Sequence, residues 1–245
     1  TLQLVEAVQD KEETMPFGNR LWLIEYDLDR MGSYISHIHK LLSTELEQFE
    51  RETEEFAASL SEADRDDFYE YKSEEYQGLK TDMPRQMYAS FVVSLYSFVE
   101  DELLRVCDLT KATINVGVRD QKDLGKGINR ARMFLKEGKG YEIDQRHWQE
   151  LTDLNKLRNR LAHGSADLKR FIEKPKLDNA QYVTLNVDDE EHYVQIQNSL
   201  YNYLRRHNML GYNGTYYISP SIEYCKQLVD FGKQLFRKIY ADLKI

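Results

Sequence analysis

Apolar residues at steps of three and four divide most of the chain into long helical segments. The pattern predicts a helix over residues 19–60 and a second over 61–79, which begins with a serine cap and an acidic first turn. These two helices would form a hairpin arm. Pro84 then opens the most apolar helix, 85–109, which is apolar nearly all the way round until Glu100. That helix is expected at the centre of a bundle.

The second half of the chain adds three more helices. A short amphipathic helix is expected over 128–136. Residues 148–164 carry one apolar stripe and end at Gly164, which supplies the left-handed residue that stops a helix. Asp144 is placed to cap the start of this helix. A final amphipathic helix follows Ser219-Pro220 and closes the bundle.

Between these helices the pattern changes to β-rich runs. Residues 182–187 and 192–196 flank an acidic turn and predict a β-hairpin, and 215–218 predict a third short strand. The fold class is therefore mainly α, with a small β insertion near 182–218. We divide the chain into an acidic helical arm, 1–82, and a helical domain, 83–245.

Composition favours a folded protein of the reducing cytoplasm. The chain has 245 residues, of which 41% are hydrophobic and 31% charged, so it is long enough to bury a sizeable core. Cys107 and Cys225 form no paired framework. The longest mostly apolar stretch is too short and too polar to span a bilayer. We therefore expect a cytoplasmic protein that does not enter membranes.

Charge is unevenly distributed along the chain. The net charge is −9, yet residues 45–75 hold 13 acidic against 3 basic residues, a net of −10. Residues 119–170 hold 13 basic against 8 acidic residues, a net of +5. A globally acidic protein can thus present a basic surface around 119–170. Ordinary solvated helix faces are the alternative, and the simpler one for the acidic run.

The main candidate chemistry lies at the end of helix 148–164. At about 100° per residue, Asn159 and His163 project within roughly 40° of each other, and Arg158 lies roughly 140° from His163. An arginine fork matches phosphate oxygens, and imidazole can take or give a proton near neutral pH. This set suits a phosphate ligand. No phosphate-binding loop and no metal-ligand spacing accompanies it, so neither a cofactor nor a metal is expected.

The segment Arg158-Asn159-x-x-x-His163 resembles the R-x4-6-H signature of the HEPN superfamily, in which a polar residue, often Asn, follows the Arg. A Leu-Tyr-x-x-x-Glu segment ending at Glu100, in an earlier apolar helix, is also similar to that superfamily. Together with the β insertion and the closing helix, the resemblance covers about 85–240 and points to the RiboL-PSP and MAE groups. The arm has no counterpart that we can place.

The resemblance implies a metal-independent endoribonuclease that acts on RNA as a homodimer. His163 would serve as general base or acid for attack of the ribose 2′-OH on its own phosphate. Arg158 would stabilise phosphate charge and Asn159 would orient the phosphate or the imidazole. Glu100 would hold Arg158 or His163 in place; alternatively, it marks where its helix leaves the core. Family members commonly act as toxins or phage-defence effectors restrained by an antitoxin or regulatory protein.

A weaker signal for RNA binding lies in residues 199–214, where arginines and aromatic residues interleave. Tyr203, Arg205 and Arg206, with Arg160, would supply base stacking and backbone neutralisation. Tyrosines that only pack a helix are the commoner explanation of such a segment.

Two other functions stay open. A non-catalytic HEPN-like module would bind nucleic acid or protein with the same fold and tolerate loss of His163. In a purely structural protein Arg158 would pair with an acidic residue, and His163 would serve only at a helix C-terminus, where positive charge is favourable. Burial of His163 against an internal acid would favour this structural interpretation.

Overall fold

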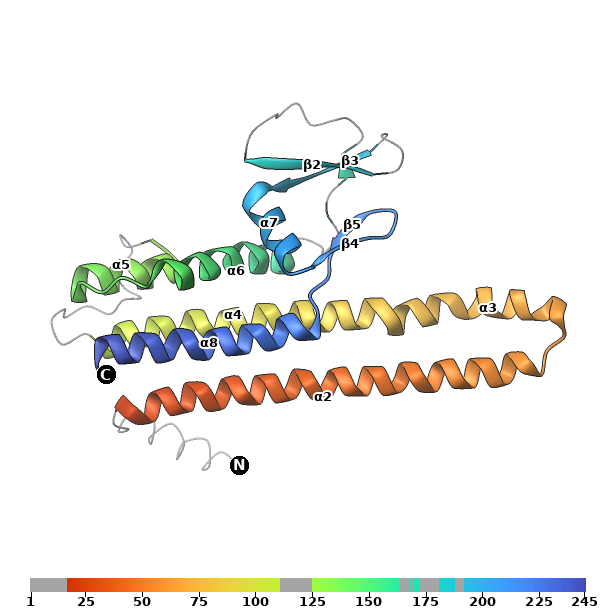
Figure 1. The fold of residues 1–245 in the computed structure, drawn as a ribbon, viewed down its shortest axis with the longest axis horizontal. Coiled ribbons are helices and arrows are strands. Elements are labelled where there is room, and N and C mark those ends of the chain that lie inside the picture. Colours follow the sequence, from red (N-terminus) through yellow and green to blue (C-terminus); the bar gives the residue numbers. More distant parts are fainter. Residues whose placement is uncertain (1–16, 111–124, 164–167, 169, 172–180, 188–191) are drawn as a thin grey trace. The chain divides into compact units, whose positions relative to one another are not determined.

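The computed structural model describes residues 17–110, 125–163, 168, 170–171, 181–187 and 192–245. Within them the protein is mainly helical, as the hydrophobic pattern predicts, with two small antiparallel sheets (Figure 1). The elements in chain order are α2 (Phe17–Ala58), α3 (Glu62–Gln77), η1 (Gly78–Asp82), α4 (Met83–Leu109), α5 (Gly127–Lys139), α6 (Gln145–His163), β1 (Arg170–Phe171), β2 (Tyr182–Val187), β3 (His192–Gln197), α7 (Asn198–Arg206), β4 (Leu210–Tyr212), β5 (Tyr216–Ile218) and α8 (Ile222–Leu243).

The segment between α3 and α4 differs from the expected break. η1 is a π-helical turn that joins the two α-helices through residues of right-handed helical conformation. Pro84 lies in the first turn of α4, as predicted, and it has no N–H to donate to a carbonyl one turn earlier. A wider π turn just before the proline is one way in which a helix accommodates such a missing bond. The chain therefore continues as helix from 62 to 109.

The described residues divide into two compact units that interleave along the sequence. Unit 1 takes its residues from 1–31, 97–149 and 228–245, and unit 2 from 32–96 and 150–227. Helices α2, α4, α6 and α8 each contribute residues to both. The units do not correspond to the segments 1–82 and 83–245, so that division of the chain stays a prediction.

Unit 1 has a core in which α2, α4 and α8 run alongside one another (Figure 1). Glu102 on α4 is only 4% exposed. Its carboxylate accepts hydrogen bonds of 2.6 and 2.8 Å from Nη2 of Arg20 on α2. A buried carboxylate requires such a partner, because desolvation strongly disfavours an isolated charge. The core also continues beyond Glu100, since Leu103 and Val106 are fully buried. The alternative that α4 leaves the core at Glu100 is therefore wrong.

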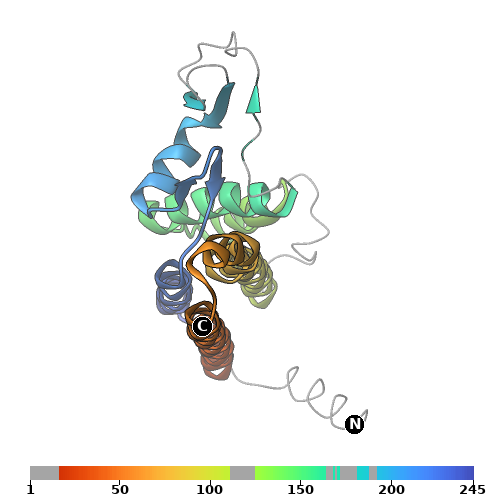
Figure 2. The same ribbon diagram turned by 90° about the vertical axis from the view of Figure 1, so that its right-hand side faces the viewer.

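Unit 2 contains both sheets. β2 and β3 form the predicted hairpin, with Tyr182 opposite Gln197 and Val187 opposite His192; the turn 188–191 lies outside the described residues. β1, which the sequence pattern did not reveal, pairs with the other edge of β3. The predicted third strand is β5, but it pairs with β4 in a separate two-stranded sheet. Figure 2 shows α7, which follows β3, beside α6.

Candidate functional site

The start of α6 is held by Asp144, as predicted. Its Oδ1 accepts hydrogen bonds of 3.1 Å from the backbone N–H groups of Arg146 and His147. The His147 ring bonds the other carboxylate oxygen of Asp144. These contacts lower the Asp144 pKa against the opposing effect of desolvation. His147 therefore belongs to the helix cap, which satisfies N–H groups that a helix leaves unbonded.

The inner face of α6 is the expected apolar stripe. Leu151, Leu154 and Leu157 are fully buried. Asp153 lies on the same face, 5% exposed, and it accepts a 3.2 Å hydrogen bond from Lys156. The helix ends at His163, and Gly164 lies outside the described residues. The candidate motif thus occupies the last two turns of a helix that is anchored in the interior of unit 2.

Arg158 is half-buried against α4. Its guanidinium carbon lies 4.6 Å from the centroid of the Tyr96 ring, and Tyr96 is 0% exposed. An arginine over an aromatic face gains on the order of 0.5–2 kcal/mol. Because Tyr96 is fully buried, this contact holds the Arg158 guanidinium against the inner side of α6.

Asn159 and His163 both lie exposed on the surface of α6. The side-chain amide of Asn159 donates a 3.3 Å hydrogen bond to Oδ1 of Asn155, one turn earlier. Residues four apart are neighbours on a helix surface, so Asn155, Asn159 and His163 follow one row toward the helix end. His163 is not buried against an internal acid, and the condition that would favour the structural interpretation is therefore not met.

Glu100 belongs to unit 1, whereas Arg158, Asn159 and His163 belong to unit 2. Its carboxylate lies against Gly127, the first residue of α5, so closely that it occupies the space of any Cβ at that position. A carboxylate at a helix N-terminus is favourable because the first N–H groups of the helix carry partial positive charge. This contact provides a structural reason for Glu100, and its catalytic role stays a prediction.

The three arginines proposed to bind RNA occupy different settings. Arg160 is half-buried in the last turn of α6. Arg205 is exposed on α7, with its guanidinium carbon 5.9 Å from the centroid of the Tyr201 ring. Arg206 is also exposed, but its Nη2 donates a 3.2 Å hydrogen bond to Oε2 of Glu150 on α6. Part of the charge on Arg206 is therefore neutralised within the chain.

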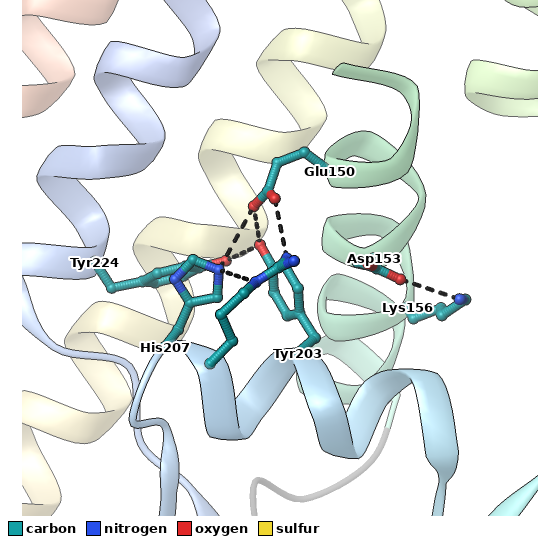
Figure 3. Close-up of polar contacts among 7 residues, drawn as sticks. Glu150, Asp153, Lys156, Tyr203, His207 and Tyr224 are labelled. Atoms are coloured by element: carbon teal, nitrogen blue, oxygen red, sulfur yellow. Dashed lines mark hydrogen bonds and ion pairs between the residues drawn. The ribbon is translucent and has the colours of Figure 1, made fainter. Parts of the chain in front are cut away.

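Tyr203 does not suit the proposed role in base stacking, because it is only 2% exposed. Its hydroxyl donates a 2.6 Å hydrogen bond to Oε1 of Glu150 and lies 2.7 Å from the hydroxyl of Tyr224, as Figure 3 shows. Since each hydroxyl has one proton, Tyr224 donates to Tyr203 in this chain of bonds. Burial raises the pKa of both tyrosines, so both stay protonated. The sequence-based alternative of a packing tyrosine is the correct one here.

His207 completes this polar cluster (Figure 3). Its ring centroid lies 4.6 Å from that of Tyr203 and 5.0 Å from that of Tyr224. Desolvation lowers the His207 pKa from its ordinary 6.5, and the negative charge of Glu150 opposes that shift. Nε2 of His207 accepts a 3.3 Å hydrogen bond from Nε of Arg206, which requires the neutral ring. The cluster is therefore a satisfied internal network that joins α6, α7 and the start of α8.

A groove of ≈ 530 Å³ lies elsewhere in unit 2, between α2, α4 and the start of α8. Inside it, the His39 ring lies 2.7 Å from the Tyr88 hydroxyl. None of the predicted site residues lines this groove. Within the described part of the chain, no group of three or more His, Cys, Asp or Glu residues is arranged to hold a metal ion.

Sequence reasoning did not identify the partners of these groups. Tyr96 was present in the Leu-Tyr-x-x-x-Glu segment, but nothing in the pattern assigned it to Arg158. Glu150 lies one turn before Leu154 on α6, and the sequence pattern assigned it no role. Its partner Tyr203 is 53 positions away in sequence, and Tyr224, which bonds Tyr203, is 21 positions further on. A linear pattern carries no pairing information over such distances.

Comparison with known proteins adds no family assignment: no protein-family model, curated protein or solved structure matches the chain. No helix among the described residues combines the length and apolar character that crossing a bilayer requires.

Proposed function

We propose that the protein is a metal-independent endoribonuclease whose site contains Arg158, Asn159 and His163. One observation supports the proposal: an arginine seated on a buried ring, an exposed amide and an exposed imidazole all belong to the last two turns of one anchored helix. The resemblance of this segment to the HEPN signature supports the same conclusion. A site of this composition binds phosphate and transfers protons without help from a metal.

The proposed reaction takes its nucleophile from the substrate. His163 accepts the proton of a ribose 2′-OH as O2′ forms a bond to the adjacent phosphorus and the bond from phosphorus to O5′ breaks. The leaving O5′ takes up a proton from water, so the products are a 2′,3′-cyclic phosphate and a 5′-hydroxyl. Arg158 stabilises the charge on the phosphate oxygens, and Asn159 orients the phosphate or the imidazole.

The wider setting follows the same resemblance. The active form is a homodimer in which two such motifs meet. The protein acts in the cytoplasm as a toxin or phage-defence effector, and an antitoxin or regulatory protein restrains it. Exposed Arg205 is the best placed of the weaker RNA-binding candidates, since it lies on α7 beside Tyr201.

The test is incubation of the purified protein with labelled single-stranded RNA and with DNA of the same sequence, both in EDTA. We expect cleavage of RNA only. His163→Ala should lower the cleavage rate by at least about 10²-fold, the lower end of what a general acid–base group contributes. The chemical form of the product ends should be 2′,3′-cyclic phosphate and 5′-hydroxyl. A 2′-deoxy nucleotide at the cut position should abolish cleavage there.

The matched control is His37→Ala, which removes another exposed histidine, from α2, and should leave the rate unchanged. Cleavage of DNA at the rate of RNA would exclude the 2′-OH mechanism. Unchanged activity of His163→Ala would remove His163 from it. RNA binding without cleavage by either protein would favour the non-catalytic module.

A further inference from the structure

The tip of the helical arm has almost no interior of its own. We define the arm tip as residues 45–77, which comprise the end of α2 and all of α3. Among these residues only Ala57 is buried, and α3 contains no buried residue. The two helices meet through ring contacts, with centroids 6.4 Å apart for Phe49 and Tyr76 and 4.9 Å apart for Phe56 and Phe68. Two helices in contact cannot cover both sides of such an aromatic seam.

A groove of ≈ 320 Å³ runs along this seam. Its walls combine aromatic rings with carboxylates. The rings are those of Phe49, Tyr69 and Tyr76, and the carboxylates are those of Glu50 and Glu54. Tyr69 remains 46% exposed. The groove therefore offers apolar faces and negative charge side by side.

The chain already places one ammonium group at this groove. Nζ of Lys72 lies 5.4 Å from the centroid of the Phe49 ring and 2.8 Å from Oε2 of Glu75. The electron-rich ring face and a carboxylate thus share one cation, which is the combination that attracts lysine and arginine. The contacts of Lys72 indicate that a cationic side chain is the kind of ligand that the other rings and carboxylates of the groove can bind.

The charge around the groove decides between possible occupants. All 13 acidic residues of 45–75 are exposed, and only 3 basic residues accompany them. The arm tip of a second copy would bring the same net charge of −10 against this one, and a nucleic acid would bring its phosphates; both are repelled. A cationic protein segment is attracted by the same field and fits the rings.

We propose that the groove of the arm tip binds a segment of a partner protein rich in lysine and arginine. A cationic side chain of that segment lies over the exposed Tyr69 ring, and its neighbours pair with Glu50 and Glu54. This inference is independent of the proposed ribonuclease activity, because it rests on no residue of α6.

The test measures binding of the full-length protein to a fluorescent peptide in which Lys and Arg alternate with Leu, followed by anisotropy. A peptide with Glu in place of Lys and Arg is the probe control. We expect the cationic peptide alone to bind, and its affinity to fall as NaCl rises from about 0.05 to about 0.5 M, because exposed charges are screened. The double variant Glu50→Gln, Glu54→Gln should weaken binding about fivefold, as expected for two exposed ion pairs.

The matched variant is Glu45→Gln, Glu52→Gln. It removes the same charge from α2, but at roughly 100° per residue these positions lie roughly 140° or more from Glu50 and Glu54, and neither lines the groove. It should weaken binding less than twofold. In the same way, Tyr69→Ser should weaken binding while Tyr71→Ser, which removes a more exposed ring outside the groove, should not.

Equal losses from both glutamate pairs would overturn the proposal, since they would show a diffuse field and not a groove. Absence of binding by the cationic peptide would also overturn it. A dimer that forms through the arm tip, seen by light scattering, would overturn the proposal as well. The proposal would also be overturned if the protein bound single-stranded RNA and the Glu50→Gln, Glu54→Gln variant altered that binding. Circular dichroism of each variant confirms that the helices are retained.

Discussion

The Tyr203 hydroxyl links two parts of unit 2, since it donates to Glu150 on α6 and accepts from Tyr224 of α8. In this interior position a tyrosine is a structural residue, whatever its neighbours in sequence suggest. The same α7 helix presents Arg205 to solvent. One short helix therefore divides its residues between the core and a surface that can meet a ligand.

Tyr203→Phe should destabilise the protein by about 1–3 kcal/mol, because it removes one hydroxyl and leaves the Glu150 and Tyr224 groups with a lost partner. Tyr201→Phe, on the same helix but half-exposed, should change the free energy of unfolding by less than about 0.5 kcal/mol. Urea denaturation of both variants measures the difference. Equal changes in the free energy of unfolding would show that the hydrogen bonds of the Tyr203 hydroxyl do not stabilise the fold.

His207 makes this network sensitive to acid. Its pKa in the folded protein lies below the ordinary 6.5 because burial disfavours the charged ring. The unfolded chain therefore binds a proton more readily as pH falls below 6.5. The contribution of the neutral His207 ring to the free energy of unfolding is fully present above pH 6.5. It is lost as pH falls toward the folded-state pKa. Urea midpoints measured from pH 7.5 downward should decrease more steeply for the native protein than for His207→Gln; parallel curves would contradict this.

At the level of elements, Gly127 shows why α5 begins where it does. Its φ is +58°, a backbone conformation that favours glycine, and the Glu100 carboxylate fills the space beside its Cα. α4 and α5 are thus joined by a carboxylate placed at a helix start. The amphipathic pattern predicted α5 itself, but only the folded chain brings Glu100 to its first residue.

Gly127→Ala should destabilise the protein by about 2–4 kcal/mol, since backbone strain of about 1–2 kcal/mol adds to displacement of the Glu100 carboxylate. Gly140→Ala is the matched control: its φ is +63°, but no atom lies within 4 Å of an added Cβ, so only the strain remains. Thermal unfolding followed by circular dichroism compares them. If Glu100→Ala does not restore part of the stability of Gly127→Ala, the crowding between them is not the cause.

The elements show which sequence signals are reliable. Long stripes of period 3.6 predicted α2, α6 and α8, because each buries one face over several turns. The nearly continuous apolar surface of 85–109 predicted α4. Three features gave no usable signal, namely the short strands β1 and β4 and the π turn η1. A two-residue strand such as β1 covers a single period of β alternation, which is too short to show a pattern. The π turn η1 is a local adjustment between two helices. Such features depend on neighbours that a linear pattern does not contain.

For the whole molecule, the main feature is that the two units share their helices. α2, α4, α6 and α8 each supply residues to both. Loss of structure in one unit therefore removes a continuation of the same helices from the other. Because helix formation is cooperative along a segment, we expect the units to unfold together.

The two cysteines report this cooperativity, since Cys107 belongs to unit 1 and Cys225 to unit 2. Burial raises the pKa of both thiols to about 12, and the thiolate is the reactive form. Neither should react with iodoacetamide at pH 8 in the folded protein. Both should become labelled at one common rate as urea is raised, read at each site by peptide mass spectrometry. Earlier labelling of one cysteine would demonstrate separate unfolding of its unit.

The sequence alone determined the helical class, most helix boundaries, the β-hairpin and the acidic run 45–75, because these follow from the period of apolar residues and from charge counts within short windows. It also located the Arg158-Asn159-x-x-x-His163 segment at the end of a helix. Only the tertiary structure decided that Arg158 lies on Tyr96, that Tyr203 belongs to the interior and that Glu100 contacts Gly127. The physical reason is the same for each: burial and pairing depend on which distant segments pack together, and periodicity describes one segment at a time.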